Sequence, residues 1–233
     1  MTPTISIIHP SRNRAHMAGE TARKWLSKAT DSSRIEYWMS CDTDDVQLEQ
    51  YRAFVGQLGL QAKYSVNRSA IEAINKVAPM TKGNILMVVS DDFDCFPDWD
   101  GYLINHLHDQ KDYLVKTSDG YMSNTWLITL PIMDRAYYNR FGYIYYPEYQ
   151  HLFCDTEMTC VGNMLGKVID IQHPSAVFQH NHYSIQRMQK DAINEKNDAT
   201  WNQGKELFLS RHSRNFDLLQ EDIKMTYPRE MFV

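Results

Sequence analysis

A short apolar run that ends abruptly in acidic residues constrains the fold of this chain more than any other feature. Residues 85–89 read Ile-Leu-Met-Val-Val, typical of a strand buried on both faces, and Asp91, Asp92 and Asp94 follow at once. Open α/β sheets bind ligands at the carboxyl ends of such strands. Clustered carboxylates repel one another unless a cation compensates, and a divalent ion shared with a diphosphate is suited to that role. The run therefore predicts a ligand site, with an acidic, solvated turn as the alternative.

The composition of the 233 residues is that of a globular protein. Hydrophobic residues make up 43% of the chain and aromatic residues 12%, enough for a large core. The net charge of -5 gives no general attraction to nucleic acid or to an anionic membrane. No run approaches the roughly 18 apolar residues of a membrane span, and the N-terminus lacks a secretion-signal pattern. The cysteines show no Cys-x-x-Cys spacing, which argues against a zinc site, so we expect a cytoplasmic protein with reduced thiols.

Strands and helices alternate along the chain. Strands are expected over residues 4–8, 35–39, 63–66, 85–89, 113–116, 125–130 and 177–182, and helices over 15–29, 46–58, 68–77 and 99–108. Residues 130–138 have the pattern of a loop that leads into a helix. This order predicts an α/β fold with a mostly parallel central sheet flanked by helices. We expect one domain over residues 1–190, with residues 191–233 as a polar, helical cap over the site.

Polar segments also follow the first two strands. The loop 10–14 reads Pro-Ser-Arg-Asn-Arg, and the segment 42–45 reads Asp-Thr-Asp-Asp. In a doubly wound sheet both would lie beside the strand that leads to Asp91 and Asp92. Ser11 is able to hydrogen-bond a base, and Asp42 to accept from a base N–H or a ribose hydroxyl. The alternative for Asp42 is a helix N-cap.

Two later segments carry further titratable groups. Asp155 and Glu157 precede an apolar helical turn, where an acidic residue serves either as a cap favoured by the helix dipole or as a general base for an acceptor hydroxyl. His180 and His182 stand at alternate positions of a strand end, so both point the same way while the chain stays extended. With the acidic cluster upstream they are either metal ligands or ordinary polar residues.

The order of these segments resembles the GT-A-fold, family-two-type nucleotide-sugar glycosyltransferases over about residues 4–184. The segments that match are Pro10-Ser11-Arg12-Asn13-Arg14, Asp42, Ala73-Ile74-Asn75, Ser90-Asp91-Asp92, Pro97-Asp98-Trp99, Cys154-Asp155-Thr156-Glu157 and His180, with Ser184 downstream. The chain departs from the pattern at Ser90, where the family has its first acid, and on both sides of Asp155. Either Asp91 takes the ribose role, or Asp92-Phe93-Asp94 is the working motif.

The resemblance implies a metal-dependent, inverting glycosyltransferase with a nucleotide-sugar donor, and UDP-sugar is the expected donor. Donor-binding residues would be Pro10, Ser11, Arg12, Asn13, Arg14, Asp42, Asn75, Ser90 and Asp91. A Mn²⁺ or Mg²⁺ ion, with ligands among Asp92, Asp94, His180 and His182, would neutralise the diphosphate leaving group. Asp155 would be the catalytic base. In the polar C-terminal segment Arg187, Lys190 and Lys196 either close over the phosphates or form a solvated helix face.

The acceptor is left open by the resemblance: a glycan, a lipid-linked sugar, a protein or a hydroxylated base in DNA. Two other classes compete with the glycosyltransferase. A sugar-phosphate nucleotidyltransferase would normally have a glycine-rich loop after the first strand, and residues 10–14 contain no glycine. A catalytically silent nucleotide-sugar-binding module is the other, and the joint retention of Asp92, Asp155 and His180 argues against it.

Overall fold

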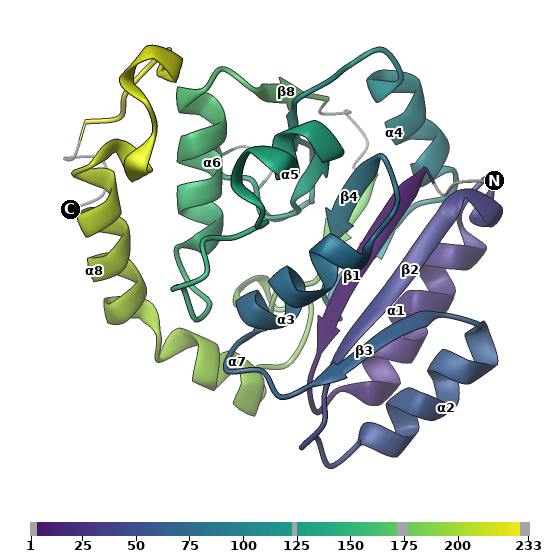
Figure 1. Cartoon of the computed structure of the whole chain (residues 1–233). Coiled ribbons are helices and arrows are strands. Elements are labelled where there is room, and N and C mark those ends of the chain that lie inside the picture. Colours follow the sequence, from purple (N-terminus) through teal and green to yellow (C-terminus); the bar gives the residue numbers. More distant parts are fainter. Residues whose placement is uncertain (1–3, 123–124, 172–176, 229–233) are drawn as a thin grey trace.

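The first half of the chain repeats a strand followed by a helix (Figure 1). The computed structural model describes residues 4–122, 125–171 and 177–228. The elements of this half are β1 (Ile5–Ser11), α1 (Ala15–Ser27), β2 (Ile35–Asp42), α2 (Leu48–Leu58), β3 (Gln61–Ser65), α3 (Ala70–Val77) and β4 (Ile85–Val88). Local signals set several bounds: the Ser69 hydroxyl caps the start of α3, and Gly59, with a φ of 65°, ends α2.

The second half adds shorter strands and the helices that surround the sheet edge. Its elements are β5 (Phe93–Cys95), α4 (Trp99–Leu107), β6 (Leu114–Lys116), β7 (Ile132–Asp134), α5 (Arg135–Phe141), α6 (Cys154–Met164), β8 (Val168–Asp170), β9 (Phe178–His180), α7 (Ala192–Asp198) and α8 (Trp201–His212). The C-terminal segment is helical, as expected. None of the described helices is long and apolar enough to cross a membrane.

The main sheet has the order β3-β2-β1-β4-β7-β6-β8, and β5 pairs with β9 in a separate antiparallel ribbon. The pairs among β1 to β4 are parallel, whereas β7 is antiparallel to both of its neighbours. The mostly parallel sheet is thus confirmed. Because Pro10 pairs with Ser40 and Ser11 with Cys41, β1 and β2 end side by side. The polar segments after these strands therefore meet at one edge of the sheet.

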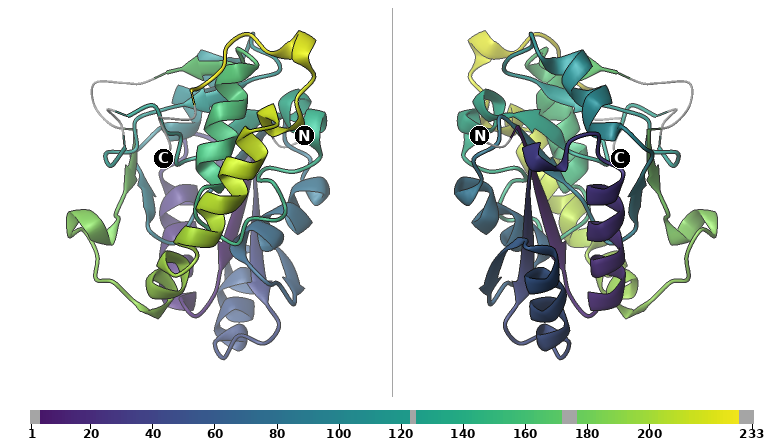
Figure 2. Two further views of the ribbon diagram at one scale, coloured as in Figure 1. Left: turned by 90° about the vertical axis from the view of Figure 1, so that its left-hand side faces the viewer. Right: turned by 90° about the vertical axis from the view of Figure 1, so that its right-hand side faces the viewer.

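A hydrophobic core covers each face of the sheet. One contains Trp25 of α1 and Trp99 of α4, whose rings lie 4.9 Å apart and which are both fully buried. The other joins α3, α5 and α6 to the opposite face, and α8 packs outside α6 through the fully buried Phe208. Figure 2 shows α8 in front of α6 in its left view and α1 along the sheet in its right view. Helices on both faces leave the strand ends as the open edge.

One predicted strand is wrong, because residues 125–130 do not form a strand. The amide of Ile128 donates to Oγ1 of Thr159 on α6, at 3.0 Å. The next strand along the chain is instead β7, which lies within residues 130–138, the stretch expected to be a loop that leads into a helix. Because β7 lies between β4 and β6 and is mostly buried, its sequence Ile-Met-Asp shows no clear alternation of apolar and polar residues.

Candidate active site

Side chains from α2 and from the turn before it hold the polar loop after β1. Asn13 has a positive φ of 55°, and its amide donates to Oδ2 of Asp45 at 2.7 Å. The amide of Arg14 donates to the hydroxyl of Tyr51 at 3.0 Å. These amides stand at the start of α1, where backbone donors have no partner within the helix, so the neighbouring side chains satisfy them. The loop is therefore a fixed part of the sheet edge.

Asp91 is buried against β1, with 8% of its surface exposed. Its carboxylate lies 2.9 Å from Nε2 of His9, accepts from the Ser11 hydroxyl at 3.1 Å and lies 3.9 Å from Nη1 of Arg14. The other ring nitrogen of His9 lies 2.8 Å from the hydroxyl of Tyr37 on β2. Asp91 thus belongs to an interior network that joins β1 and β2 to the chain that follows β4.

The carboxylate of Asp42 is shared between two neighbours at the end of β2. One oxygen accepts from Nη1 of Arg12 at 2.5 Å, and the other from Nδ2 of Asn67 at 2.6 Å. Hydrogen bonds to Asp44 and Asp42 raise the pKa of the Arg12 guanidinium. Asp42 does not cap α2, whose N-cap is Gln47, so the capping interpretation is wrong.

Asn75 holds a loop by backbone hydrogen bonds. Its Nδ2 donates to the carbonyl of Tyr145 at 2.7 Å, and its Oδ1 accepts from the amide of Ile144 at 3.0 Å. These bonds tie α3 to the loop that precedes α6. The structure therefore gives Asn75 a part in positioning that loop.

Asp92 and His180 meet where β4 runs into the β5–β9 ribbon. Oδ2 of Asp92 lies 3.3 Å from Nε2 of His180, and the Ser90 hydroxyl donates to Oδ1 at 2.6 Å. The ribbon fixes this meeting, because Phe93 pairs with His180 and stacks on its ring at 4.2 Å. Burial raises the pKa of the Asp92 carboxyl, but the hydrogen bonds and charge of His180, with the Ser90 hydroxyl, outweigh it and lower that pKa to about 2.

The other two candidate metal ligands have different surroundings. Asp94 faces α1, where its carboxylate lies 2.7 Å from Nζ of Lys28 and 3.5 Å from Nζ of Lys24. The ring of His182 lies 5.2 Å from that of His180, but its Nδ1 lies 2.8 Å from the Ser184 hydroxyl. The structure therefore brings His182 beside the Asp92–His180 pair and leaves Asp94 outside it.

The Asp92–His180 pair has the spacing of two adjacent ligands of one divalent ion. Ligands that lie about 2.1 Å from an ion stand roughly 3 Å apart when they are neighbours on an octahedron. Among the described residues, no three His, Cys, Asp or Glu side chains form a complete metal site. A pair of protein ligands is what an ion shared with substrate phosphates requires, since phosphate oxygens and water take the other positions. The residues present therefore fit such an ion.

Asp155 lies in the first turn of α6. The helix begins directly after Phe153, a non-glycine residue with a φ of 71°. Its carboxylate accepts from the amide of Thr156 at 2.8 Å. Burial raises the pKa of Asp155, and the Thr156 amide and the charge of His180 offset part of that rise. His180 is therefore among the charges that act on Asp155.

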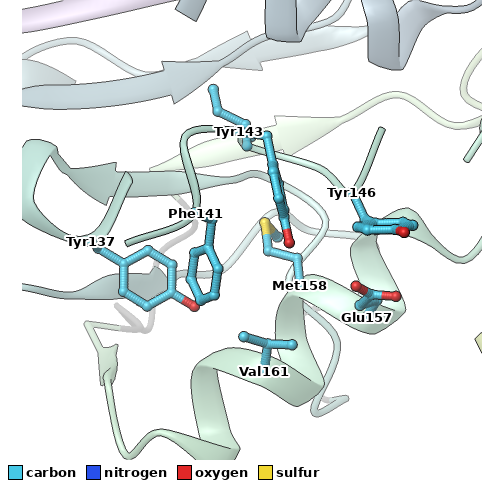
Figure 3. A pocket seen from close by; sticks show the side chains of 8 residues that line it. Tyr137, Phe141, Tyr143, Tyr146, Glu157, Met158 and Val161 are labelled. Carbon is cyan, nitrogen blue, oxygen red and sulfur yellow. The ribbon is translucent and has the colours of Figure 1, made fainter. Parts of the chain in front are cut away.

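Glu157 points to the opposite side of α6, because two residues along a helix differ by about 200°. Its carboxylate lies 2.8 Å from Nε of Arg211 on α8 and accepts from the Tyr149 hydroxyl at 2.8 Å. This side of α6 also borders an aromatic cleft of about 320 Å³, including space open to solvent (Figure 3). Its lining is Tyr137, Phe141, Tyr143, Ile144, Tyr146, Glu157, Met158 and Val161. The cleft is therefore separate from the candidate site.

The sequence analysis missed two residues of the site, His151 and Asp119. His151 lies in the loop before α6, and burial lowers the pKa of its ring to about 4, although the charges of Asp92 and Asp198 oppose that effect. Asp119 is buried, its Oδ2 lies 3.9 Å from Nδ1 of His180, and its carbonyl accepts from the His180 amide at 2.7 Å. A signal for His151 was its position four residues before Asp155, whereas Asp119 carries no local motif.

The strap, defined here as residues 183–198, crosses the open edge and includes α7 (Figure 1). Arg14 donates to both oxygens of Asp191, at 2.7 and 2.6 Å, and thereby ties the strap to the loop after β1. The Tyr183 hydroxyl bonds Asp198 at 2.7 Å, and Nζ of Lys190 lies 2.7 Å from Asp198. Of the three C-terminal cations that the sequence singled out, Lys190 therefore forms an ion pair within the strap.

The fold is one that glycosyltransferases use. Two structures that resemble the chain are a mannosyltransferase, PcManGT from Pyrobaculum calidifontis in complex with GDP-Man and Mn²⁺, and TarS from S. aureus. The TM-scores are 0.67 and 0.62 and the identities 13% and 14%, with 94% of this chain covered in each case. The chain spans 66% of the length of the first and 41% of the second. The sequence matches no family model and no curated protein.

Proposed function

We propose that this protein is a metal-dependent, inverting glycosyltransferase that moves a sugar from a nucleotide diphosphate donor to an acceptor hydroxyl. The observation that carries the proposal is the convergence of Asp92 and His180 at the carboxyl edge of the sheet, 3.3 Å apart. The fold shared with a mannosyltransferase that binds GDP-Man and Mn²⁺ supports it.

Asp92 and His180 would hold a Mn²⁺ or Mg²⁺ ion beside the donor diphosphate. The ion, when bound, neutralises the charge that develops on the leaving diphosphate. Ser90 orients Asp92 by its 2.6 Å hydrogen bond, which leaves Oδ2 directed toward His180. Asp119 lies behind His180, with its Oδ2 3.9 Å from Nδ1 of the ring, beyond hydrogen-bond distance, so it would act on His180 through its charge.

The loop after β1 and the end of β2 would bind the nucleotide. Arg14 is a fixed cation at the sheet edge, suited to a phosphate, and Asp42 is suited to a ring N–H of a base. Both uracil and guanine present such an N–H. UDP is the proposed nucleotide on the position of Asp42, and GDP is the comparison to make, since the mannosyltransferase of similar fold holds GDP-Man.

Asp155 would act as the general base. Burial raises the pKa of its carboxyl, which makes it a stronger base than an exposed aspartate, while the nearby Thr156 amide keeps the ionised form accessible. In a single displacement Asp155 takes the proton of the acceptor hydroxyl as its oxygen attacks the anomeric carbon. The bond to the diphosphate breaks on the opposite side, so the anomeric configuration inverts.

The proposal is tested by thermal shift with UDP, GDP, ATP and CTP, each with Mn²⁺ or with EDTA. A ligand at 100 times its Kd stabilises by about 2.7 kcal/mol, so binding is readily seen. We expect UDP or GDP to stabilise the protein only with the metal, and Asp92→Ala to remove that effect. Asp94→Ala, a matched change two residues away, should keep it, because Asp94 pairs with Lys28. Stabilisation by ATP or CTP alone, indifferent to EDTA, would instead favour the nucleotidyltransferase.

A further inference from the structure

His151 is held in a defined place by α8. The amide next to it, that of Leu152, donates to Oγ1 of Thr200 at 3.4 Å. The start of α8 packs directly on this loop, since a Cβ on Gly204 would lie 2.5 Å from the Leu152 carbonyl oxygen. The backbone next to His151 is therefore held against α8.

The charges of several residues of the candidate site act on the ring of His151. The charged and titratable groups that act on it are Asp92, Asp198, Arg14 and His182. These residues come from four separate segments: the end of β4, the strap, the loop after β1 and the chain after β9. Two of these residues, Asp92 and Arg14, are proposed to hold the ion and a phosphate of the donor.

The Nδ1 atom of His151 is buried and has no hydrogen-bond partner among the described residues. Buried polar atoms nearly always have one, and an exception calls for an explanation such as a ligand. Burial lowers the pKa of the ring to about 4, so the imidazole is neutral at pH 7 and has one N–H to donate. In the tautomer that carries its hydrogen on Nδ1, the unpaired atom is a donor that an acceptor of a ligand beside Asp92 and Arg14 would satisfy.

We infer that His151 binds the diphosphate of the donor, with its Nδ1–H donating to a phosphate oxygen. The inference rests on the proposed function and adds a residue to it. Phosphate oxygens are strong acceptors, and they are what a cation such as Arg14 and an ion at Asp92 would bring to this place. The same hydrogen bond strengthens as negative charge develops on the leaving diphosphate, so His151 is a catalytic residue of the proposed transfer.

The test compares three replacements of His151 by titration calorimetry with UDP, GDP and inorganic pyrophosphate, all with Mn²⁺. His151→Leu removes the donor and should weaken diphosphate binding about 10-fold or more. His151→Asn keeps an N–H near the Nδ1 position and should stay within about threefold of wild type, whereas His151→Gln moves the donor outward and should lose as much as Leu. His108→Leu, on an exposed histidine that follows α4, is the matched control and should bind as wild type does.

Two further measurements separate this role from others. The affinity for Mn²⁺ alone, from the electron paramagnetic resonance signal of the free ion, should be unchanged in His151→Leu; a loss would make His151 a metal ligand and overturn the inference. The melting temperature of His151→Leu without ligand should equal or exceed that of wild type, because an unsatisfied buried nitrogen has been removed.

The outcomes distinguish the two proposals. If wild type binds the diphosphates and His151→Leu and His151→Gln bind them equally well, only the role of His151 is wrong. If wild type binds none of the three probes with Mn²⁺, the proposed function and the role of His151 both fail. If His151→Leu does not fold, the contrast between the Asn and Gln variants decides, and equal affinity in those two would overturn the inference.

Discussion

Three aspartates within four positions of one strand end have three different environments. Asp91 joins the interior network with His9, Asp92 meets His180, and Asp94 pairs with Lys28 at the C-terminal end of α1. The sequence predicted the acidic cluster because a buried strand followed by carboxylates is a local pattern. It did not show which carboxylate faces the site, because residues 91 and 92 form a turn before β5 and the alternation of an extended strand does not apply there.

Replacing Asp155 tests the proposed base at the residue scale. Asp155→Asn keeps the shape of the side chain but removes its ability to accept a proton, so sugar transfer should fall by about 10²–10⁴-fold. Binding of UDP or GDP with Mn²⁺ should change little, because that energy lies with the nucleotide loop and the metal. Rates come from a transfer assay and affinities from calorimetry. Asp109→Asn, on an exposed aspartate, should have wild-type rates.

The direction of the pKa shift of Asp155 predicts how activity and stability depend on pH. Burial raises the pKa of Asp155 in the folded protein, so the transfer rate of wild type should increase as pH rises through that pKa. A raised carboxyl pKa means that folding stability falls as pH rises from the unfolded-state pKa to the folded-state pKa. Asp155→Asn should therefore be at least as stable as wild type at pH 7 in urea unfolding. A variant that is less stable yet fully active would identify Asp155 as a structural residue.

At the scale of elements, the two sides of α6 carry residues with different roles: the proposed base on one side and a buried ion pair on the other. Asp155, the proposed base, lies in the first turn of α6, and Glu157, about 200° around the helix from it, forms a buried ion pair with Arg211, whose side chain is 2% exposed. This pair fixes α8 on α6, and α8 in turn holds the loop that contains His151. The stability of the ion pair therefore bears on the geometry of the site.

Breaking the ion pair from one side should destabilise the protein strongly. Arg211→Met leaves the Glu157 carboxylate buried without its cation, which costs about 3–5 kcal/mol. The free energy of unfolding in urea measures this loss. Arg214→Met is the matched control, since Arg214 pairs with Asp217 with both side chains about half exposed, and the change should cost less than about 1 kcal/mol. Combining Arg211→Met with Glu157→Leu should recover much of the lost free energy of unfolding. If Arg211→Met proved as stable as the control Arg214→Met, a structural role for the Glu157–Arg211 pair would be contradicted.

The sequence predicted elements well where the signal is local and poorly where it is not. The strand–helix units from β1 to β4 repeat a pattern that each unit carries in its own residues, and all of them were predicted. The predicted strands 4–8 and 35–39 end too early, because β1 continues to Ser11 and β2 to Asp42. Residues 125–130 read Thr-Trp-Leu-Ile-Thr-Leu, a short apolar stretch of the kind found in strands, yet Ile128 bonds to Thr159 on α6 instead of to a sheet neighbour. Packing against α6 thus decided that β7, and not residues 125–130, joins the sheet.

At the scale of the whole molecule, the candidate site depends on contacts that no sequence period reports. Asp92 and His180 are 88 residues apart, and Arg14 and Asp191 are 177 residues apart. The resemblance to a known family predicted the first contact through the order of motifs. The second carries no motif, and it is the contact that ties the strap to the loop after β1.

The last prediction concerns the strap, because its Asp191 is paired with Arg14, the cation proposed to bind a phosphate. Its carboxylate takes two hydrogen bonds from Arg14, so a diphosphate at Arg14 competes with it. Asp191→Asn removes the competing charge and keeps the N-cap of α7, since Asn caps as well as Asp. The Kd for UDP or GDP with Mn²⁺ should fall about 3–10-fold in calorimetry, because a charge-assisted pair no longer has to be broken. Asp198→Asn loosens the strap at Tyr183 and Lys190 without freeing Arg14, and it should give no such gain. Weaker binding by Asp191→Asn would show that the carboxylate supports the phosphate site, in which case the strap closes with the donor bound.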